Sequence, residues 1–155
     1  MHISFIFSNT EKKEVIRMKT DFFRCGMYGW CLEILWTGLH SLTNHDRKLM
    51  GVSSLHMFPI YGMAAFFRPL AARLSKYGTL TRGCVYMCCI YAVEYLSGSY
   101  LKKRDCCPWD YSSSRYHING VIRLDYAPLW FLTGLFYERA IAPRQHKSPS
   151  TPVDP

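Results

Sequence analysis

Long stretches without charge are scarce in this 155-residue sequence. Only Leu49–Phe67 runs for nineteen positions without Asp, Glu, Lys or Arg, close to the roughly 20 residues with which a helix crosses a bilayer. The sequence also has no CxxC pair and no phosphate-binding P-loop. It therefore offers no pattern typical of a zinc centre, a thiol-redox site or an ATPase.

No catalytic grouping is visible either. A hydrolase needs a nucleophile beside a base that a third group orients, and Ser53 or Ser54 near His56 is too common a coincidence to count. The seven cysteines are an odd number, which argues against a secreted disulfide framework. We expect structural thiols, with palmitoylation of Cys106 or Cys107 as the alternative. We expect no enzyme activity, no cofactor and no metal.

The composition leaves the class of protein open. A hydrophobic content of 49% and a net charge of +8, with a mean hydropathy of −0.06, do not by themselves indicate a membrane protein. The basic residues separate hydrophobic segments instead of forming one face, and no nucleic-acid motif is present. We therefore expect an anionic membrane surface, or charge that flanks membrane spans, and not nucleic acid, to account for the positive charge.

Four hydrophobic segments of nearly spanning length predict an all-α fold, a four-span helical membrane bundle. The predicted spans lie near residues 22–40, 51–70, 80–101 and 121–141, with an ordered interfacial connector between spans 3 and 4. Residues 1–21 are expected to form an N-terminal cytoplasmic segment, 22–142 the transmembrane domain and 143–155 a disordered tail. A soluble helical domain is the alternative, but soluble helices usually carry charge along a whole face.

Small and polar residues recur at three- and four-residue intervals in the first segment: Gly26, Gly29, Glu33, Thr37 and His40. On a helix they form one stripe. In lipid such a stripe faces other helices, because small residues permit close approach and a carboxyl group avoids hydrocarbon. The stripe therefore predicts a helix–helix contact.

Three acids inside the apolar segments, Glu33, Glu94 and Asp125, are the candidate binding residues. An acid in a span marks a polar interior site for a cation, a proton or a headgroup. The alternative is that these acids hydrogen-bond across the bundle and hold the helices together. We expect Glu33 and Glu94 to approach each other or a common polar group. Arg123, two residues before Asp125, argues against that acid as a free site.

The connector between the third and fourth segments is rich in aromatic and turn-forming residues, notably Trp109, Asp110, Tyr111, Ser112 and Asn119. Trp and Tyr favour the membrane interface because one end of each ring is apolar and the other hydrogen-bonds. We expect Asp110 to cap a helix or fix a turn. Asn119–Gly120 is a turn signal.

The basic residues give an orientation. With four spans, the side that holds both termini carries 12 Lys and Arg residues and the other side carries 7. Because cytoplasmic loops are enriched in Lys and Arg, both termini are predicted to be cytoplasmic.

The order of these pieces resembles the vertebrate transmembrane protein 229 family. More distantly, it is similar to the bacterial putative ABC-transporter type IV (CmpB-like) family. The matching pieces are Glu33, Gly51–Leu55, Met57–Gly62, Glu94–Tyr95, Cys107–Ser112, Asn119–Gly120, Leu124–Pro128 and Trp130–Phe131. The resemblance implies a small multi-span helical membrane protein. Without a P-loop in this chain, any ATPase would be a separate protein.

These observations predict a multi-pass membrane protein, either a transport or permease-like component with a polar intramembrane site, or a structural or regulatory protein that binds a partner or lipid. The lipid bilayer, and with it another membrane protein, are the expected partners. The sequence does not identify a substrate.

Overall fold

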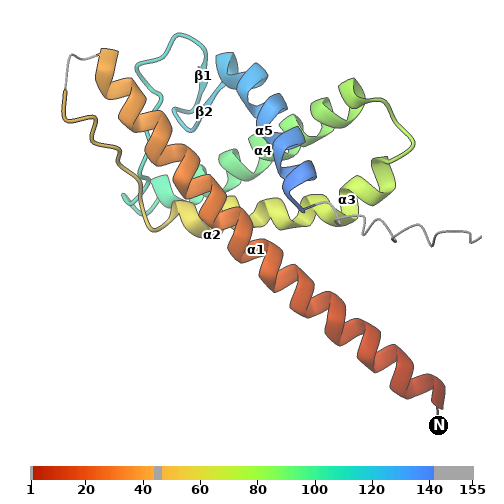
Figure 1. Ribbon diagram of the computed structural model, residues 1–155. Coiled ribbons are helices and arrows are strands. Elements are labelled where there is room, and N and C mark those ends of the chain that lie inside the picture. Colours follow the sequence, from red (N-terminus) through yellow and green to blue (C-terminus); the bar gives the residue numbers. More distant parts are fainter. Residues whose placement is uncertain (1, 44–46, 142–155) are drawn as a thin grey trace, which may run out of the picture.

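The computed structural model of the chain describes residues 2–43 and 47–141, with side chains for residues 11–43 and 47–141. It is mostly helical, which confirms the predicted all-α character (Figure 1). The helical elements are α1 (His2–Thr43), α2 (Met57–Gly62), η1 (Met63–Phe66), α3 (Phe67–Leu74), α4 (Thr79–Lys102), η2 (Leu124–Tyr126) and α5 (Ala127–Ile141). A two-stranded hairpin, β1 (His117–Ile118) and β2 (Ile122–Arg123), precedes η2.

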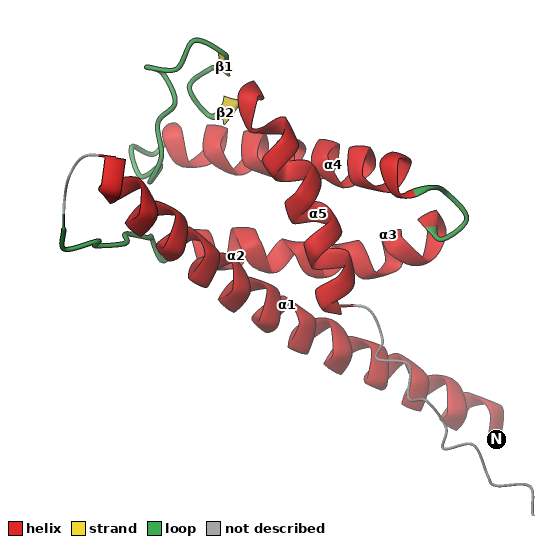
Figure 2. Cartoon of the chain, turned by 45° about the horizontal axis from the view of Figure 1, so that its top comes forward, coloured by secondary structure: helices red, strands yellow, loops and turns green. Residues whose placement is uncertain are grey.

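α1 packs along α2 and η1, and α4 packs against α5 (Figure 2). The N-terminal half of α1 extends beyond the other helices (Figure 1). One helix thus runs through residues 21–22, because Glu, Lys, Arg and Met in residues 11–19 favour helix as much as the apolar residues that follow. The predicted boundary there, between a cytoplasmic segment and a transmembrane domain, stays a prediction.

The second predicted segment, 51–70, is not one helix, and this corrects the sequence analysis. Its first part, residues 51–56, forms neither helix nor strand and is hydrogen-bonded to α1, and the rest is divided into α2, η1 and the start of α3. Pro59 and Pro69 each lie in the first turn of a short helix, where a missing backbone N–H costs no hydrogen bond. Pro59 therefore marks a helix start.

The fourth predicted segment begins as a helix only at Ala127. Its first residues pair in an antiparallel hairpin, in which Ile118 lies opposite Ile122. Asn119 and Gly120 have φ values of 53° and 70°, which confirms the predicted turn. A Cβ on Gly120 would lie 2.3 Å from the Ser112 hydroxyl, so this position needs glycine.

No helix within residues 2–43 and 47–141 is both long enough and apolar enough to cross a bilayer. The four spans expected from the sequence are therefore not observed as four spanning helices. Helix α5 has only 15 residues, the second segment is divided, and charged residues interrupt α1 and α4.

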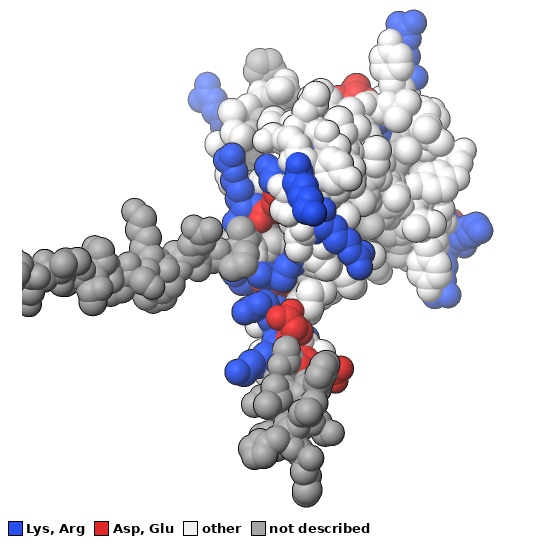
Figure 3. Space-filling view, turned by 90° about the vertical axis from the view of Figure 1, so that its right-hand side faces the viewer, with Lys and Arg blue, Asp and Glu red and all other residues white. Residues whose placement is uncertain are grey.

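Large apolar side chains remain exposed on several described helices. Leu96 of α4 is 69% exposed and Leu132 of α5 is 63% exposed. One face of the molecule shows broad areas without Lys, Arg, Asp or Glu (Figure 3). Exposed side chains such as Leu96 and Leu132 are apolar surface that the helix packing of the described residues leaves uncovered.

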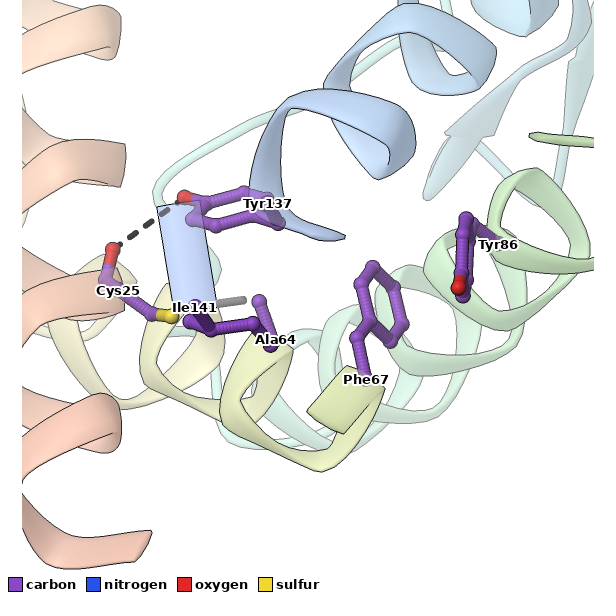
Figure 4. Close-up of a cluster of buried hydrophobic side chains, with 6 residues drawn as sticks. All are labelled: Cys25, Ala64, Phe67, Tyr86, Tyr137 and Ile141. Carbon is purple, nitrogen blue, oxygen red and sulfur yellow. Dashed lines mark hydrogen bonds between the residues drawn. The ribbon is translucent and has the colours of Figure 1, made fainter. Parts of the chain in front are cut away.

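A small core joins the two helix pairs (Figure 4). The Tyr137 hydroxyl of α5 donates a hydrogen bond to the Cys25 carbonyl of α1 at 3.3 Å. The rings of Phe67 and Tyr86 stack with their centroids 4.8 Å apart. These contacts fix α5 against α1 and α4 against the start of α3.

Candidate functional site

The small-and-polar stripe of α1 faces the chain between residues 50 and 62, as the sequence predicted. A Cβ on Gly26 would meet the Phe58 ring at 2.8 Å, and one on Gly29 would meet Tyr61 at 2.2 Å. Further along the stripe, the Thr37 hydroxyl bonds both the N–H and the carbonyl of Val52. Side chains of α1 thus satisfy several backbone groups of the non-helical segment before α2, groups that a helix would otherwise pair internally.

Glu33 lies on this stripe and is partly buried. Its carboxylate accepts a hydrogen bond of 2.5 Å from the Ser53 hydroxyl, and the Tyr61 side chain is a further electrostatic neighbour. Both groups are neutral. The polar partners of Glu33 are therefore hydroxyl groups of the neighbouring segment.

Glu94 of α4 is only 9% exposed. Its carboxylate accepts a hydrogen bond from the indole Nε1 of Trp130 in α5, at 3.2 Å. The Tyr111 side chain of the connector is an electrostatic neighbour of Glu94. Glu94 thus joins α4 to α5, again through a neutral donor.

Tyr111 is an electrostatic neighbour of both acids, Glu94 first and Glu33 more weakly. That Glu33 and Glu94 face one shared interior stays a prediction. Among the described residues, no Lys or Arg forms an ion pair with Glu33 or Glu94. We call Glu33, Tyr61, Glu94, Tyr111 and Trp130 the acid site.

An aromatic wall borders the acid site. The Tyr126 ring lies 5.8 Å from that of Tyr111 and 6.0 Å from that of Trp130, both edge to face. The sequence analysis did not assign Tyr126 a role at the site. Tyr126 and Trp130 are four residues apart, the spacing that puts two side chains on one side of a helix. This spacing is the feature of the sequence that could have placed Tyr126 beside Trp130.

Asp125, the third candidate, is exposed and is not brought to the acid site. The Arg123 guanidinium binds its carboxylate with two short contacts, 2.7 Å from Nη2 and 2.8 Å from Nε. Because residues 121–126 form a strand and a 3-10 turn, Asp125 does not have the helical register that the sequence analysis assumed. It serves as the partner of Arg123.

The connector motif is ordered by its own polar contacts. Asp110 Oδ1 accepts hydrogen bonds from the backbone N–H and the hydroxyl of Ser112, at 3.0 and 2.6 Å. These bonds lower the pKa of the Asp110 carboxyl. Asp110 therefore fixes a turn, one of its two expected roles.

Other members of the motif tie the connector to α4 and the hairpin. The Trp109 indole donates to the Val121 carbonyl at 2.9 Å, and Asn119 donates to the Tyr95 hydroxyl at 3.1 Å. Apart from Tyr111, the motif is positioned to hold the connector in place, and it does not contact the buried acids. All seven cysteines are free thiols.

A second charged cluster, which the sequence analysis did not single out, lies at the other end of the bundle. Asp21 of α1 is 2% exposed. Its carboxylate pairs closely with Arg68 and, at 3.9 Å, with Arg24. In the sequence these residues resemble the charged flanks of apolar segments. Nothing in the sequence next to Asp21 indicates that its side chain is buried while those of its neighbours are exposed.

The sequence profile of one family matches most of the chain, residues 20–152, and the description of that family is Putative ABC-transporter type IV. The chain belongs to this family. No solved structure matches the chain. The resemblance to the transmembrane protein 229 family stays a prediction.

Proposed function

We propose that this chain is a multi-pass, membrane-embedded component of a transport system, whose acid site takes up a small monovalent cation or a proton. The observation that carries the proposal is that two carboxylates within the helices, the partly buried Glu33 and the buried Glu94, each accept a hydrogen bond from a neutral donor, Ser53 and Trp130 respectively. A transport-related role agrees with the family. The substrate of such a system is not specified by these residues.

Placement in a membrane is supported by how apolar and acidic side chains are distributed. Along α4, Leu96 is exposed while Glu94 is buried, and along α5, Leu132 is exposed while Trp130 turns its indole N–H to Glu94. A soluble domain places its acids outside and its leucines inside. The opposite arrangement suits a bundle whose outer surface meets hydrocarbon.

A common side for both termini is part of the proposal. The end of α5 reaches α1 near the beginning of its apolar part, since the Arg24 guanidinium donates to the Ala140 carbonyl at 3.1 Å. The excess of Lys and Arg on this side favours the cytoplasm.

The acid site suits a cation for an electrostatic reason. A carboxylate removed from water is costly unless a positive charge or a proton accompanies it. Hydroxyl and indole donors offset only part of this cost. A Na⁺ or K⁺ ion can exchange its water for carboxylate and hydroxyl oxygens, and a proton can bind a carboxylate oxygen directly.

A structural role is the second candidate, and a specific observation favours it. Each hydrogen bond at the acid site joins two parts of the chain: Ser53 to α1 through Glu33, and Trp130 to α4 through Glu94. In this case the acids hold the bundle together, and the protein acts by binding a partner or lipid through its outer surface.

Thermal unfolding of the purified full chain in nanodiscs distinguishes these functions. A cation present at about 100 times its Kd stabilises the folded state by about 2.7 kcal/mol. We expect NaCl or KCl to raise the unfolding midpoint above that in N-methylglucamine chloride of equal ionic strength. Proteoliposomes with an internal pH dye report proton uptake in parallel.

The decisive variant is Glu94→Gln, which keeps shape and hydrogen-bonding capacity but removes the charge. The proposal predicts a folded protein that has lost its response to cations or its proton uptake. Glu11→Gln is the matched control, because Glu11 is exposed on α1, and it should respond like the wild type. The transport proposal fails if the wild type shows neither a cation-induced midpoint shift nor proton uptake. It also fails if the Glu94→Gln variant keeps the response of the wild type. In either case the structural role is the one supported.

A further inference from the structure

An open cavity of about 990 Å³ lies where α1 leaves the bundle, next to the end of α5. Five of its lining side chains are cationic: Lys13, Arg17, Arg24, Arg68 and Arg139. They come from α1, α3 and α5. Figure 3 shows Lys and Arg side chains, with some Asp and Glu side chains among them, in the lower part of the molecule. We call this the basic cavity.

Carboxylates balance the basic cavity only in part. Asp21, in its wall, pairs with Arg68 and Arg24, and Glu14 pairs with Arg17 at 3.2 Å. Five cations thus meet two acids, which leaves a surplus of three positive charges. The Glu14–Arg17 pair is exposed and therefore weak. A bound anion can take the place of the Glu14 carboxylate beside Arg17 at little cost in free energy.

The cations of the basic cavity differ in how firmly they are held. Asp21 fixes Arg68, and the Arg24 guanidinium bonds the Ala140 carbonyl at the end of α5. Within the described part of the chain, Lys13 and Arg139 form no ion pair or side-chain hydrogen bond. Two anchored guanidinium groups and two unengaged cations therefore share one cavity.

We propose that the basic cavity binds a phosphate-bearing anion. Guanidinium groups match phosphate oxygens in pairs, and arginines from three helices converge here. The volume lies within the 300–1,000 Å³ usual for ligand pockets, so a phospholipid headgroup as well as a free phosphate fits.

The level of the basic cavity along the bundle favours a lipid headgroup as the source of this phosphate. Arg24 lies where the apolar part of α1 begins, and Arg139 lies near the end of α5. In a bundle embedded as proposed above, these positions meet the headgroups of the cytoplasmic leaflet, where anionic lipids are enriched. The choice of a lipid thus rests on the proposed membrane placement, whereas anion binding rests on the cavity and its charges and does not require the acid site to bind a cation.

Binding is measured as a shift of the unfolding midpoint of the full chain in mild detergent at constant ionic strength. The probes are dioctanoyl phosphatidylserine, dioctanoyl phosphatidylinositol bisphosphate, dioctanoyl phosphatidylcholine and inorganic phosphate. We expect a saturable rise with the two anionic lipids and none with the zwitterionic one. A rise with inorganic phosphate that equals the lipid effect identifies soluble phosphate as the ligand source and still supports the site.

The test variant is Arg139→Gln, and its matched control is Arg73→Gln. Arg73 is an exposed arginine of α3 outside the cavity lining, so both changes remove one positive charge from a helix surface. Loss of one charge-assisted phosphate contact should weaken apparent binding roughly 5- to 10-fold in Arg139→Gln and leave Arg73→Gln unchanged. Lys13→Gln should act in the same direction as Arg139→Gln.

Two results would overturn the proposal. Equal weakening in Arg139→Gln and Arg73→Gln would mean that general surface charge, and not the cavity, attracts the anion. No midpoint shift with any anionic probe would mean that the cavity holds solvent only. Because a cation effect at Glu94 is measured with different probes, failure of one proposal leaves the other standing.

Discussion

Gly134 provides a sharp test of how α4 and α5 pack. A Cβ built on Gly134 would lie 2.4 Å from the Cβ of Tyr86, whereas carbon atoms in contact normally stay 3.5–4.0 Å apart. The facing atom is itself a Cβ on a fully buried residue, so it cannot rotate away. The change Gly134→Ala therefore forces the two helices apart.

The expected cost follows from two opposing effects. Overpacking of a well-packed interior costs typically about 1–3 kcal/mol, and the upper end applies because backbone has to move. The gain in helix propensity from Gly to Ala returns about 1 kcal/mol. The net loss is about 2 kcal/mol, which lowers the unfolding midpoint of a chain of this size by about 4–8 °C.

The measurement is a thermal melt of both variants in the same nanodiscs, with Gly78→Ala as the control. Gly78 precedes α4 with a φ of −64°, and a Cβ there would meet nothing within 4 Å. Its midpoint should be unchanged or slightly raised. A Gly134→Ala protein as stable as the wild type would refute the close approach of α4 and α5.

Two further predictions concern single interactions and are tested by the same melts. Trp130→Phe keeps an aromatic ring but removes the donor to Glu94. Leaving that buried acceptor unpaired should lower the free energy of unfolding by about 1–3 kcal/mol. A Trp36→Phe control, at an exposed position, should melt like the wild type. Asp21→Asn leaves Arg68 without its carboxylate and should cost about 3 kcal/mol; a loss below 1 kcal/mol would show that this pair behaves like an ordinary surface pair.

The sequence predicted features that depend on local spacing. The stripe from Gly26 to Thr37 requires only helical periodicity, and it does face the neighbouring segment. The turn at Asn119–Gly120 and the inward placement of Glu94 follow from equally local chemistry. For these features one helix or one turn is enough to determine the outcome.

Features that depend on how distant segments meet were not predictable in this way. Pro59 indicates where a helix starts within residues 51–70, but the non-helical part before it is held by hydrogen bonds that α1 supplies to the backbone near Val52, and no property of the segment alone indicates those bonds. Asp125 left the expected site because a hairpin replaced the first turns of the fourth helix. Asp21 is buried because Arg68, 47 positions away, folds onto it.

The central claim is that Glu33 and Glu94 form one site for a cation. The most direct measurement compares Glu33→Gln, Glu94→Gln and the double variant for the shift of the unfolding midpoint caused by Na⁺ or K⁺. If the carboxylates share one ion, either single change abolishes the shift and the double change removes nothing more. Single variants that each keep part of the shift, with losses that add in the double variant, would contradict a shared site.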